Sequence, residues 1–511
     1  MIKILSSKDI KALEALTVQK EPVNAEDLVE RAAKAFTAVF ARRFPATKRV
    51  VVFAGQGGNG ADALAIARLL IERYSFIRVE TFFFNAPSGH ISETCDVHRG
   101  RLKAVRGVVF TEVRSHFNPP ALKKDDIVID GLFGIGLNRE LSGGFAGVAG
   151  YINSSSATVV AVDIPSGLPA DGGWGGTASS FIIRAAVTIS FAFPKLSFMM
   201  AGSYPFVGEW EVVDIGLDRK SVDEMAASSY LLEAADVTCR LPARRKSDHK
   251  GIFGHALLVA GSRQMGGAAI LAAGGCMRAG AGKLTVHTTA SCAAALLSRV
   301  PEAMVSVDGD APHITYAPAA DGYNAVAVGP GLGLHPGTAA AVRWLLGSVN
   351  CPVVVDGDAL NMVAGDKNML SLMPKGSILT PHIKEFDRIA GESASDSERL
   401  TKAKALAGRH SLVIVLKGAN TAICAPSGDT FFNNTGNPGL ATAGSGDVLT
   451  GIILGLLAAG CTPLDAAICG AYIHGLAADI SLRSQSAESL LAGDIVTNTG
   501  AALRRLHAGK Q

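Results

Sequence analysis

Residues 49–74 read RVVVFAGQGGNGADALAIARLLIERY. Residues 49–54 form an almost uninterrupted apolar run, which is typical of a buried strand. A glycine-rich loop follows at residues 55–62, and the periodic segment from Ala63 to about Tyr74 predicts a helix. A buried strand that passes through a glycine loop into a helix is the repeating unit of a parallel, doubly wound α/β sheet. Ligands of such sheets bind in the loops at the carboxyl ends of the strands.

The same alternation extends along the chain. In the first half, further strands are predicted at residues 77–84, 126–130, 157–163 and 186–191. In the second half, strands are predicted at residues 255–261, 283–288, 325–329, 352–356, 377–380 and 411–417. Between the halves, residues 217–254 are charged and irregular, which indicates a linker or a lid. We therefore expect an α/β fold with two doubly wound domains, at residues 1–216 and 228–511.

The composition is that of a large folded protein. The 511 residues are more than one ordinary core accommodates, and 48% of them are hydrophobic. The net charge of +3 is too small to indicate a nucleic-acid or membrane partner. Eight cysteines without a CxxC pair predict neither a disulfide nor a zinc framework. No signal peptide is apparent, and the longest apolar stretch, residues 448–464, is short and glycine-rich, so we expect a buried helix and a cytoplasmic protein.

Three loops of the first half carry polar residues at predicted strand ends. Residues 55–62 favour a phosphate or nucleotide cradle; the alternative is a tight glycine turn in which Asp62 caps the helix. Asp130 and Asp163 each follow an apolar strand, and each alone could be a turn residue. Because the carboxyl ends of parallel strands meet at one edge of the sheet, the three loops together indicate a ligand site.

The motifs GQGGNGAD, DGLFGIGL and VDIPSG, at residues 55–62, 130–137 and 162–167, resemble the YjeF N-terminal domain, the NAD(P)H-hydrate epimerase. The resemblance implies that Asp163 binds the substrate and is the acid or base at the reacting carbon. It also implies a potassium ion held by Asn59, Asp130 and Ser166, whose oxygen ligands suit a hard cation. The loops implied to bind the dinucleotide are Gly58, Asn59, Gly60, Ala61 and Asp62, and Gly134, Ile135, Gly136, Leu137, Asn138, Arg139 and Glu140. The chain departs from the family loop GNNGGDG at Gly58, Ala61 and Ala63, and it retains Asn59 and Asp62.

A second glycine loop, GSGD at residues 444–447, leads into the apolar segment 448–460. A helix N-terminus exposes unpaired N–H groups and the positive end of the helix dipole, so this junction can hold a phosphate. Asp447 is then placed to act as a base, unless it is an ordinary N-cap. Glycine or polar loops also follow five other predicted strands of this half, at residues 261–267, 329–333, 356–358, 380–386 and 417–421. The series predicts a continuous pocket rim.

These segments resemble the YjeF C-terminal domain, a ribokinase-like fold that acts as NAD(P)H-hydrate dehydratase, and the resemblance covers nearly all of residues 228–511. It implies that the hydrated nucleotide contacts Ala268, Gly331, His382 and Asp447, with Asp447 as the base. It implies that an adenine nucleotide, ADP or ATP with Mg²⁺, contacts Lys417, Gly418, Ala419, Asn420, Thr421 and Gly446. Considered without the resemblance, His382 could instead be a helix-start histidine and Lys417 a surface lysine.

The motifs together predict a bifunctional enzyme that repairs hydrated NADH and NADPH. The first half would interconvert the R and S epimers of the hydrate, and the second would dehydrate the S form at the expense of ADP or ATP. One alternative keeps the second half as a ribokinase-like kinase of a small alcohol. Another treats the first half as a non-catalytic nucleotide-binding module, against which the presence of Asp163 and Asn59 argues. We also expect a homo-oligomer.

Overall fold

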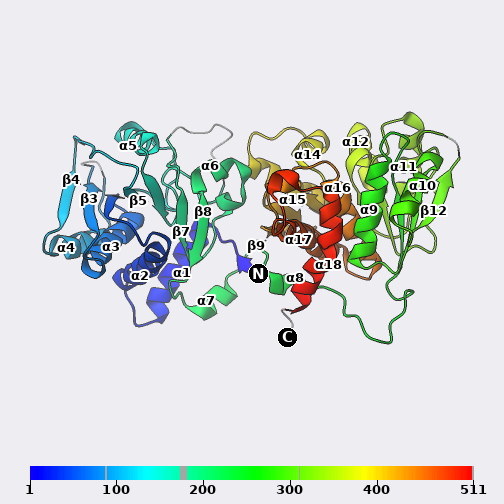
Figure 1. Ribbon diagram of the computed structural model, residues 1–511. Coiled ribbons are helices and arrows are strands. Elements are labelled where there is room, and N and C mark those ends of the chain that lie inside the picture. The colour runs from blue at the N-terminus through cyan, green and yellow to red at the C-terminus, as the bar shows by residue number, and fades with distance from the viewer. Residues whose placement is uncertain (87–88, 173–180, 310, 509–511) are drawn as a thin grey trace. The chain divides into compact units, whose positions relative to one another are not determined.

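The computed structural model describes residues 1–86, 89–172, 181–309 and 311–508, and the chain divides into two compact units (Figure 1). The first unit is Lys3–Ala227 with Ser395–Ser397. The second is Met1–Ile2, Ser228–Ala394 and Glu398–Gln511. Within the described residues, no helix is both long and apolar enough to cross a membrane.

The first unit contains a seven-stranded sheet in the order β4-β3-β2-β5-β6-β7-β8, in which every neighbouring pair is parallel. The order reverses between β2 and β5, which is the switch point where doubly wound sheets bind ligands. Two edge strands, β4 and β8, were not predicted, because they are only partly buried and lack a continuous apolar run. The strands are β2 (Arg49–Ala54), β3 (Arg78–Phe84), β4 (Val109–Val113), β5 (Ile127–Gly131), β6 (Thr158–Val162), β7 (Val187–Phe191) and β8 (Glu209–Val213).

Helices cover both faces of this sheet. Val50 and Val52 of β2 pack into the core formed with α2, α3 and α4, whereas Val51 and Phe53 pack into the core formed with α5. Figure 1 shows α5 on the opposite side of the sheet from the other three helices. This alternation is why a parallel strand is apolar along its whole length. The main helices are α1 (Ser7–Lys20), α2 (Ala25–Arg43), α3 (Gly58–Arg73), α4 (Glu93–Lys103) and α5 (Gly143–Ser154); short helices are α6 (Tyr204–Val207) and α7 (Arg219–Glu224).

The second unit contains an eleven-stranded mixed sheet in the order β1-β9-β18-β17-β16-β15-β14-β13-β10-β11-β12. From β16 to β12 the pairs are parallel, but β17 is antiparallel to both its neighbours. The α/β class is confirmed, and the added hairpin is the main departure from a purely parallel sheet. The strands are β1 (Ile2–Lys3), β9 (Ser229–Leu231), β10 (His255–Val259), β11 (Lys283–Thr289), β12 (Met304–Asp308), β13 (Ala325–Val328), β14 (Val353–Val355), β15 (Ile378–Leu379), β16 (Val413–Leu416), β17 (Thr421–Cys424) and β18 (Thr430–Asn433).

The segment 217–254 is more ordered than the expected linker or lid. It contains α7, β9 and α8 (Ala234–Thr238), and β9 pairs with β18 in the second sheet. The sequence did not predict these elements, because each is six residues or shorter and they lie in a charged segment. The remaining helices of the second unit are α9 (Gly266–Ala279), α10 (Ala290–Arg299), α11 (Pro336–Ser348), α12 (Gly357–Gly365), α13 (Met369–Leu372), α14 (Ile383–Ala390), α15 (Asp396–His410), α16 (Ser445–Ala458), α17 (Pro463–Ser481) and α18 (Ala492–Ala508).

Helices α9 and α16 touch backbone to backbone. A Cβ atom at Gly451 would overlap the carbonyl of Ala272, and one at Gly455 would overlap that of Cys276. Because both residue numbers rise together along the contact, the two helices run parallel and their N-termini lie at the same end. The glycines of α16 are therefore contact residues of a buried helix, as the sequence predicted for this stretch.

Candidate active sites

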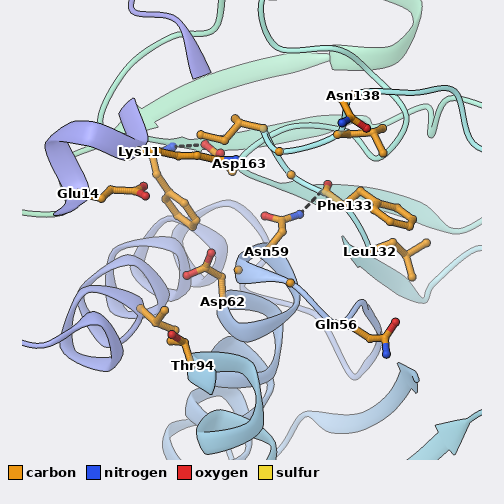
Figure 2. Close-up of a pocket in the computed structure, with 18 of the residues that line it drawn as sticks. Lys11, Glu14, Gln56, Asn59, Asp62, Thr94, Leu132, Phe133, Asn138 and Asp163 are labelled. Carbon is orange, nitrogen blue, oxygen red and sulfur yellow. Dashed lines mark hydrogen bonds between the residues drawn. The ribbon is translucent and has the colours of Figure 1, made fainter. Parts of the chain in front are cut away.

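The first unit has a cavity of about 1060 Å³ at the carboxyl ends of its central strands (Figure 2). Its wall combines residues of α1 and α2 with the loops that follow β2, β5 and β6. Most of the residues assigned to the epimerase site lie on this wall, namely Gly58, Asn59, Asp62, Gly134, Ile135, Gly136, Leu137, Asn138, Arg139, Glu140 and Asp163. Gly60 and Ala61 do not, because both are buried in the first turn of α3.

The glycine loop is shorter than predicted, since α3 begins at Gly58 rather than at Ala63. Its N-cap is Gly57 and no side chain caps it, so the alternative in which Asp62 is the cap is wrong. Gly57, Gly58 and Asn59 of this helix start line the cavity, and uncapped N–H groups at a helix start can bind an anion. Gly60 cannot be replaced here, because a Cβ atom would overlap the carbonyl of Gly55. Burial and the neighbouring Asp163 and Glu14 raise the pKa of Asp62 well above its usual value.

Asp163 is held in an unusual backbone conformation by a buried lysine. Its φ is 63°, in the left-handed region that a residue other than glycine rarely adopts. Its Oδ1 accepts hydrogen bonds from Lys195 Nζ (2.7 Å), from the N–H of Phe191 (2.9 Å) and from Ser190 Oγ (3.2 Å). Lys195 is only 1% exposed and also donates to the carbonyls of Phe191 and Phe193. One carboxylate oxygen is thus fixed, and within the described residues Oδ2 has no protein partner.

Asn59 and Ser166 contact the backbone of Phe133, and Ser166 links that backbone to Asp130. Ser166 Oγ donates to Asp130 Oδ1 (2.6 Å) and accepts from the N–H of Phe133 (2.9 Å), while Asn59 donates to the Phe133 carbonyl (2.9 Å). Asp130 is fully buried, and burial raises its pKa to about 6 although Ser166 and Leu132 donate to it. No ion pair reaches Asp130 from the described residues. A buried carboxylate grouped with carbonyl and hydroxyl oxygens fits a hard monovalent cation.

The second site begins at the N-terminus of α16. Gly444 is the N-cap, with φ of 88° and no side-chain cap, and Asp447 lies inside the first helical turn. The interpretation of Asp447 as an N-cap is therefore wrong. Burial, followed by the negative charge of Asp356, raises the pKa of Asp447 to about 7, although Lys417 opposes the shift. His474, whose pKa burial lowers to about 4, donates from Nε2 to the Ser445 carbonyl (2.9 Å) and holds this turn.

Lys417 is not a loose surface lysine. Its Nζ donates to Asp356 Oδ1 (3.0 Å), and Thr450 of α16 donates to the other oxygen of Asp356 (2.7 Å). A Cβ atom at Gly446 would lie 3.3 Å from Lys417 Nζ, so the ammonium group stands at the uncapped helix N-terminus. Of the other members of the assigned loop, Gly418, Ala419 and Asn420 lie in the turn between β16 and β17, and Thr421 is the first residue of β17.

The residues assigned to the hydrated nucleotide approach the same helix end. A Cβ atom at Gly331 would lie 2.8 Å from Ala268 Cβ, and Gly333 N donates to Asp358 Oδ2 (2.7 Å). Ala268 lies one turn before the Ala272 contact on α9, and Asp447 one turn before Gly451 on α16. The parallel register therefore places Ala268 and Asp447 at matching levels of neighbouring helices.

His382 has the structural role that the sequence left open. Its Nδ1 accepts from the N–H groups of Lys384 and Glu385 at the start of α14, and its own N–H donates to the Glu385 carboxylate. His382 also bridges to Lys417 through the backbone. Its side chain is 50% exposed, so Nε2 is accessible to a ligand, although it lies 3.5 Å from Glu385.

Comparisons with known proteins extend over both units. Residues 25–197 match the family model described as YjeF-related protein N-terminus, and residues 256–499 match the model described as NAD(P)H-hydrate dehydratase. A bifunctional NAD(P)H-hydrate repair enzyme from Moorella thermoacetica is 37% identical over 90% of this chain and 88% of its own length. The chain belongs to the family of bifunctional NAD(P)H-hydrate repair enzymes.

Solved structures match the second unit of this repair-enzyme chain. A ribokinase-like superfamily protein from Enterococcus faecalis is 26% identical, with a TM-score of 0.50, and covers 55% of this chain and 98% of its own. An ADP/ATP-dependent NAD(P)H-hydrate dehydratase from Bacillus subtilis, co-crystallised with ATP and Mg²⁺, is 36% identical over 54% of this chain and 98% of its own, with a TM-score of 0.47. The predicted family and the predicted ribokinase-like fold of the second unit are therefore confirmed.

Several residues that contact or neighbour the candidate site residues were not predicted. Lys195 could have been noticed as a single charge in the apolar segment 190–200, and Asp356 as the end of a valine-rich strand. Thr450 and Glu14 gave no signal, since a threonine in an apolar helix and a glutamate on an amphipathic one are common. Among the described residues, no group of three or more His, Cys, Asp or Glu side chains is placed to hold a metal ion.

Proposed function

We propose that this chain is a bifunctional NAD(P)H-hydrate repair enzyme with one activity in each unit. Family membership over nearly the whole chain gives the two reactions. The observation that carries the proposal is the position of Asp447, a carboxyl group with a raised pKa at an uncapped helix N-terminus beside Lys417. A base and an anion site within one helical turn are what phosphorylation of a substrate hydroxyl requires.

In the second unit, Asp447 takes the proton from the hydroxyl of the S hydrate as that oxygen attacks the terminal phosphorus of ADP or ATP. The N–H groups of Ser445 and Gly446 and the Lys417 ammonium group stabilise the negative charge of the transferring phosphate. The C–O bond of the product then breaks with its electron pair on the leaving phosphate, the neighbouring ring carbon loses a proton to water, and the C–H pair forms the double bond of the dihydronicotinamide ring. Ala268, Gly331 and His382 line the hydrate side, and residues 417–421 the nucleotide side. Mg²⁺ bound to the nucleotide phosphates would neutralise part of their charge.

In the first unit, the free Oδ2 of Asp163 serves as the acid or base at the hydroxyl-bearing carbon. The hydrogen bonds to Oδ1 fix the direction of the carboxylate, which is the condition for efficient proton transfer. The uncapped N-terminus of α3 and the loop 134–140 hold the pyrophosphate and the nucleosides. Potassium bound by Asn59, Asp130 and Ser166 would neutralise the buried Asp130 carboxylate and rigidify the adjoining Phe133 loop.

One assay tests both activities. The purified protein receives a mixture of the two NADH hydrate epimers with ADP and Mg²⁺, and the absorbance of restored dihydronicotinamide is followed. The proposal predicts conversion of the entire mixture. Rapid conversion of one epimer alone would contradict the epimerase role of the first unit, and a stable phosphorylated product without restored NADH would favour a small-alcohol kinase.

The potassium assignment has its own test. Unfolding of the first unit is followed with potassium or tetramethylammonium chloride at equal ionic strength. Potassium should raise the unfolding temperature, and Asp130→Asn should abolish that increase because the neutral amide attracts the ion less. An equal increase of the unfolding temperature in the variant would show that potassium binds elsewhere.

A further inference from the structure

Glu14 is a carboxyl group of the first cavity to which the motifs assign no role. It lies on α1, next to the buried Leu13, and it lines the cavity. Figure 2 shows the carboxylates of Glu14, Asp62 and Asp163 pointing into a common space from three separate segments. Within the described residues, no hydrogen bond or ion pair occupies the Glu14 carboxylate.

Charged groups surround Glu14 on several sides. Lys11 faces it from its own helix, Asp62 from α3, and Asp163 and Lys195 from the loops after β6 and β7. Burial first, and Asp163 second, raise the pKa of Glu14 to about 7, although Lys195 and Lys11 oppose the shift. Glu14 can therefore gain or lose a proton near neutral pH.

The other helices packed on α1 leave this carboxyl group free. The α2 residues on the cavity wall are apolar, namely Ala25, Leu28, Val29 and Ala32. From α7, the N-cap Asp218 lies 3.6 Å from Lys20, and its N–H donates to Thr17. The N-cap carboxylate of α7 thus pairs with Lys20, more than one turn away from Glu14 along α1.

Epimerisation of the hydrate needs two proton-transfer groups. The C–O bond breaks as its electron pair stays on oxygen and the ring-nitrogen lone pair forms C=N; one acid protonates the departing hydroxide to water. Water then adds to the opposite face of the ring, its electron pair forming the new C–O bond. A base on that face takes the extra proton, and the C=N pair returns to nitrogen. A single carboxyl group cannot serve both faces without moving around the ring.

We propose that Glu14 is the second proton-transfer residue of the epimerase half and acts on the ring face opposite Asp163. This inference rests on the proposed epimerase function. In the active state, Glu14 and Asp163 together carry one proton, and each turnover passes this proton from one carboxyl group to the other. The reaction can then run in either direction without a separate proton source.

The test compares three variants of the full chain. Glu14→Gln removes the titrating group, Glu14→Asp keeps it on a shorter side chain, and Glu21→Gln is the matched control at the end of the same helix, where Glu21 pairs with Arg31 outside the cavity. Equilibration of separated epimers is measured across neutral pH by chromatography, without adenine nucleotide. Dehydration by the second unit, measured in the same preparations, controls for the amount of folded protein.

For the unmodified chain, we expect kcat/KM for epimerisation to fall about tenfold per pH unit above pH 7, as the pair loses its proton. Glu14→Gln should lower kcat at least about 10²-fold and remove this decline. Glu14→Asp should be slower but keep the decline, and Glu21→Gln should match the unmodified chain.

Three results would overturn the role of Glu14. They are an unchanged rate in Glu14→Gln, a lowered rate with the same pH profile, and loss of the decline in Glu14→Asp. If instead the unmodified chain fails to equilibrate the epimers, the proposed epimerase function itself is wrong.

Discussion

Asp163 and Asp447 are two carboxyl groups proposed for proton transfer, yet their surroundings differ. Asp163 sits in a left-handed loop, and a buried lysine fixes one of its oxygens. Asp447 lies in a regular helical turn, and burial with neighbouring carboxylates raises its pKa to about 7. The surroundings of Asp163 fix the orientation of its carboxylate, whereas those of Asp447 raise its proton affinity. The surroundings alone thus give the same side chain two different chemical characters, which the proposed function uses for two reactions.

The largest expected effect is on dehydration. Asp447→Asn should lower it by about 10²–10⁴-fold, because the amide cannot take the proton of the attacking hydroxyl. Stability should hardly change, since Asp447 caps no helix and the usual loss of about 1 kcal/mol for a removed N-cap does not apply. Restored NADH is measured with the S hydrate and ADP, and epimerisation is the internal control. Near-normal turnover would exclude Asp447 as the base.

Asp163→Asn should lower epimerisation by about 10²-fold and leave dehydration of the S form unchanged. Asparagine is the suitable replacement because it tolerates a φ of 63°, and its amide oxygen can still accept from Lys195. Epimer equilibration is followed by chromatography. If the variant still equilibrates the epimers at the rate of the unmodified chain, the binding-module interpretation of the first unit is supported.

The pH dependence of dehydration tests the difference in proton affinity. Because the base form of Asp447 is required, kcat/KM for dehydration should rise about tenfold per pH unit below about pH 7 and level off above it. The small residual activity of Asp447→Asn should no longer change with pH over this range. A profile that is flat from weakly acidic to neutral pH would contradict the raised pKa.

The smallest effect concerns the histidine that holds the α16 turn. His474 is buried in its neutral form, and its pKa falls from 6.5 in the unfolded chain to about 4. Protons therefore favour the unfolded state, and the free energy of unfolding of the second unit should fall by at most about 3 kcal/mol between pH 6.5 and pH 4. Denaturant titrations of the unmodified chain and His474→Gln measure this. An identical acid loss in the variant would assign the effect to other groups.

The sequence predicted the strands that are buried on both faces, such as β2 and β10, because a continuous apolar run has few other interpretations. It missed β12 at the sheet edge, where part of the strand is exposed, and the four-residue strands β17 and β18. It also placed the start of α3 too late. Glycines have low helix propensity, and only the close approach of Gly60 to Gly55 explains why they begin this helix.

The candidate sites divide in a similar way. Loop residues such as Asp163 and Asp447 were predicted because glycines mark the loops around them. Lys195 contacts Asp163, 32 positions away, and Asp356 contacts Lys417, 61 positions away. A local sequence pattern does not predict such pairs. Asp447 illustrates a further limit, because its environment depends on the burial of the α16 turn and on charges from other strands.

The contact between α9 and α16 sets the position of Ala268 relative to Asp447. One helix carries Ala268 and the other Asp447, and Gly451 and Gly455 let their backbones touch. A methyl group at either glycine would push the helices apart and move Ala268, the proposed hydrate contact, relative to Asp447, the proposed base. Natural selection for repair would then preserve two residues that have no functional group and touch no ligand. Among relatives of this chain, loss of these glycines should accompany loss of dehydration even where every polar residue of the site is retained.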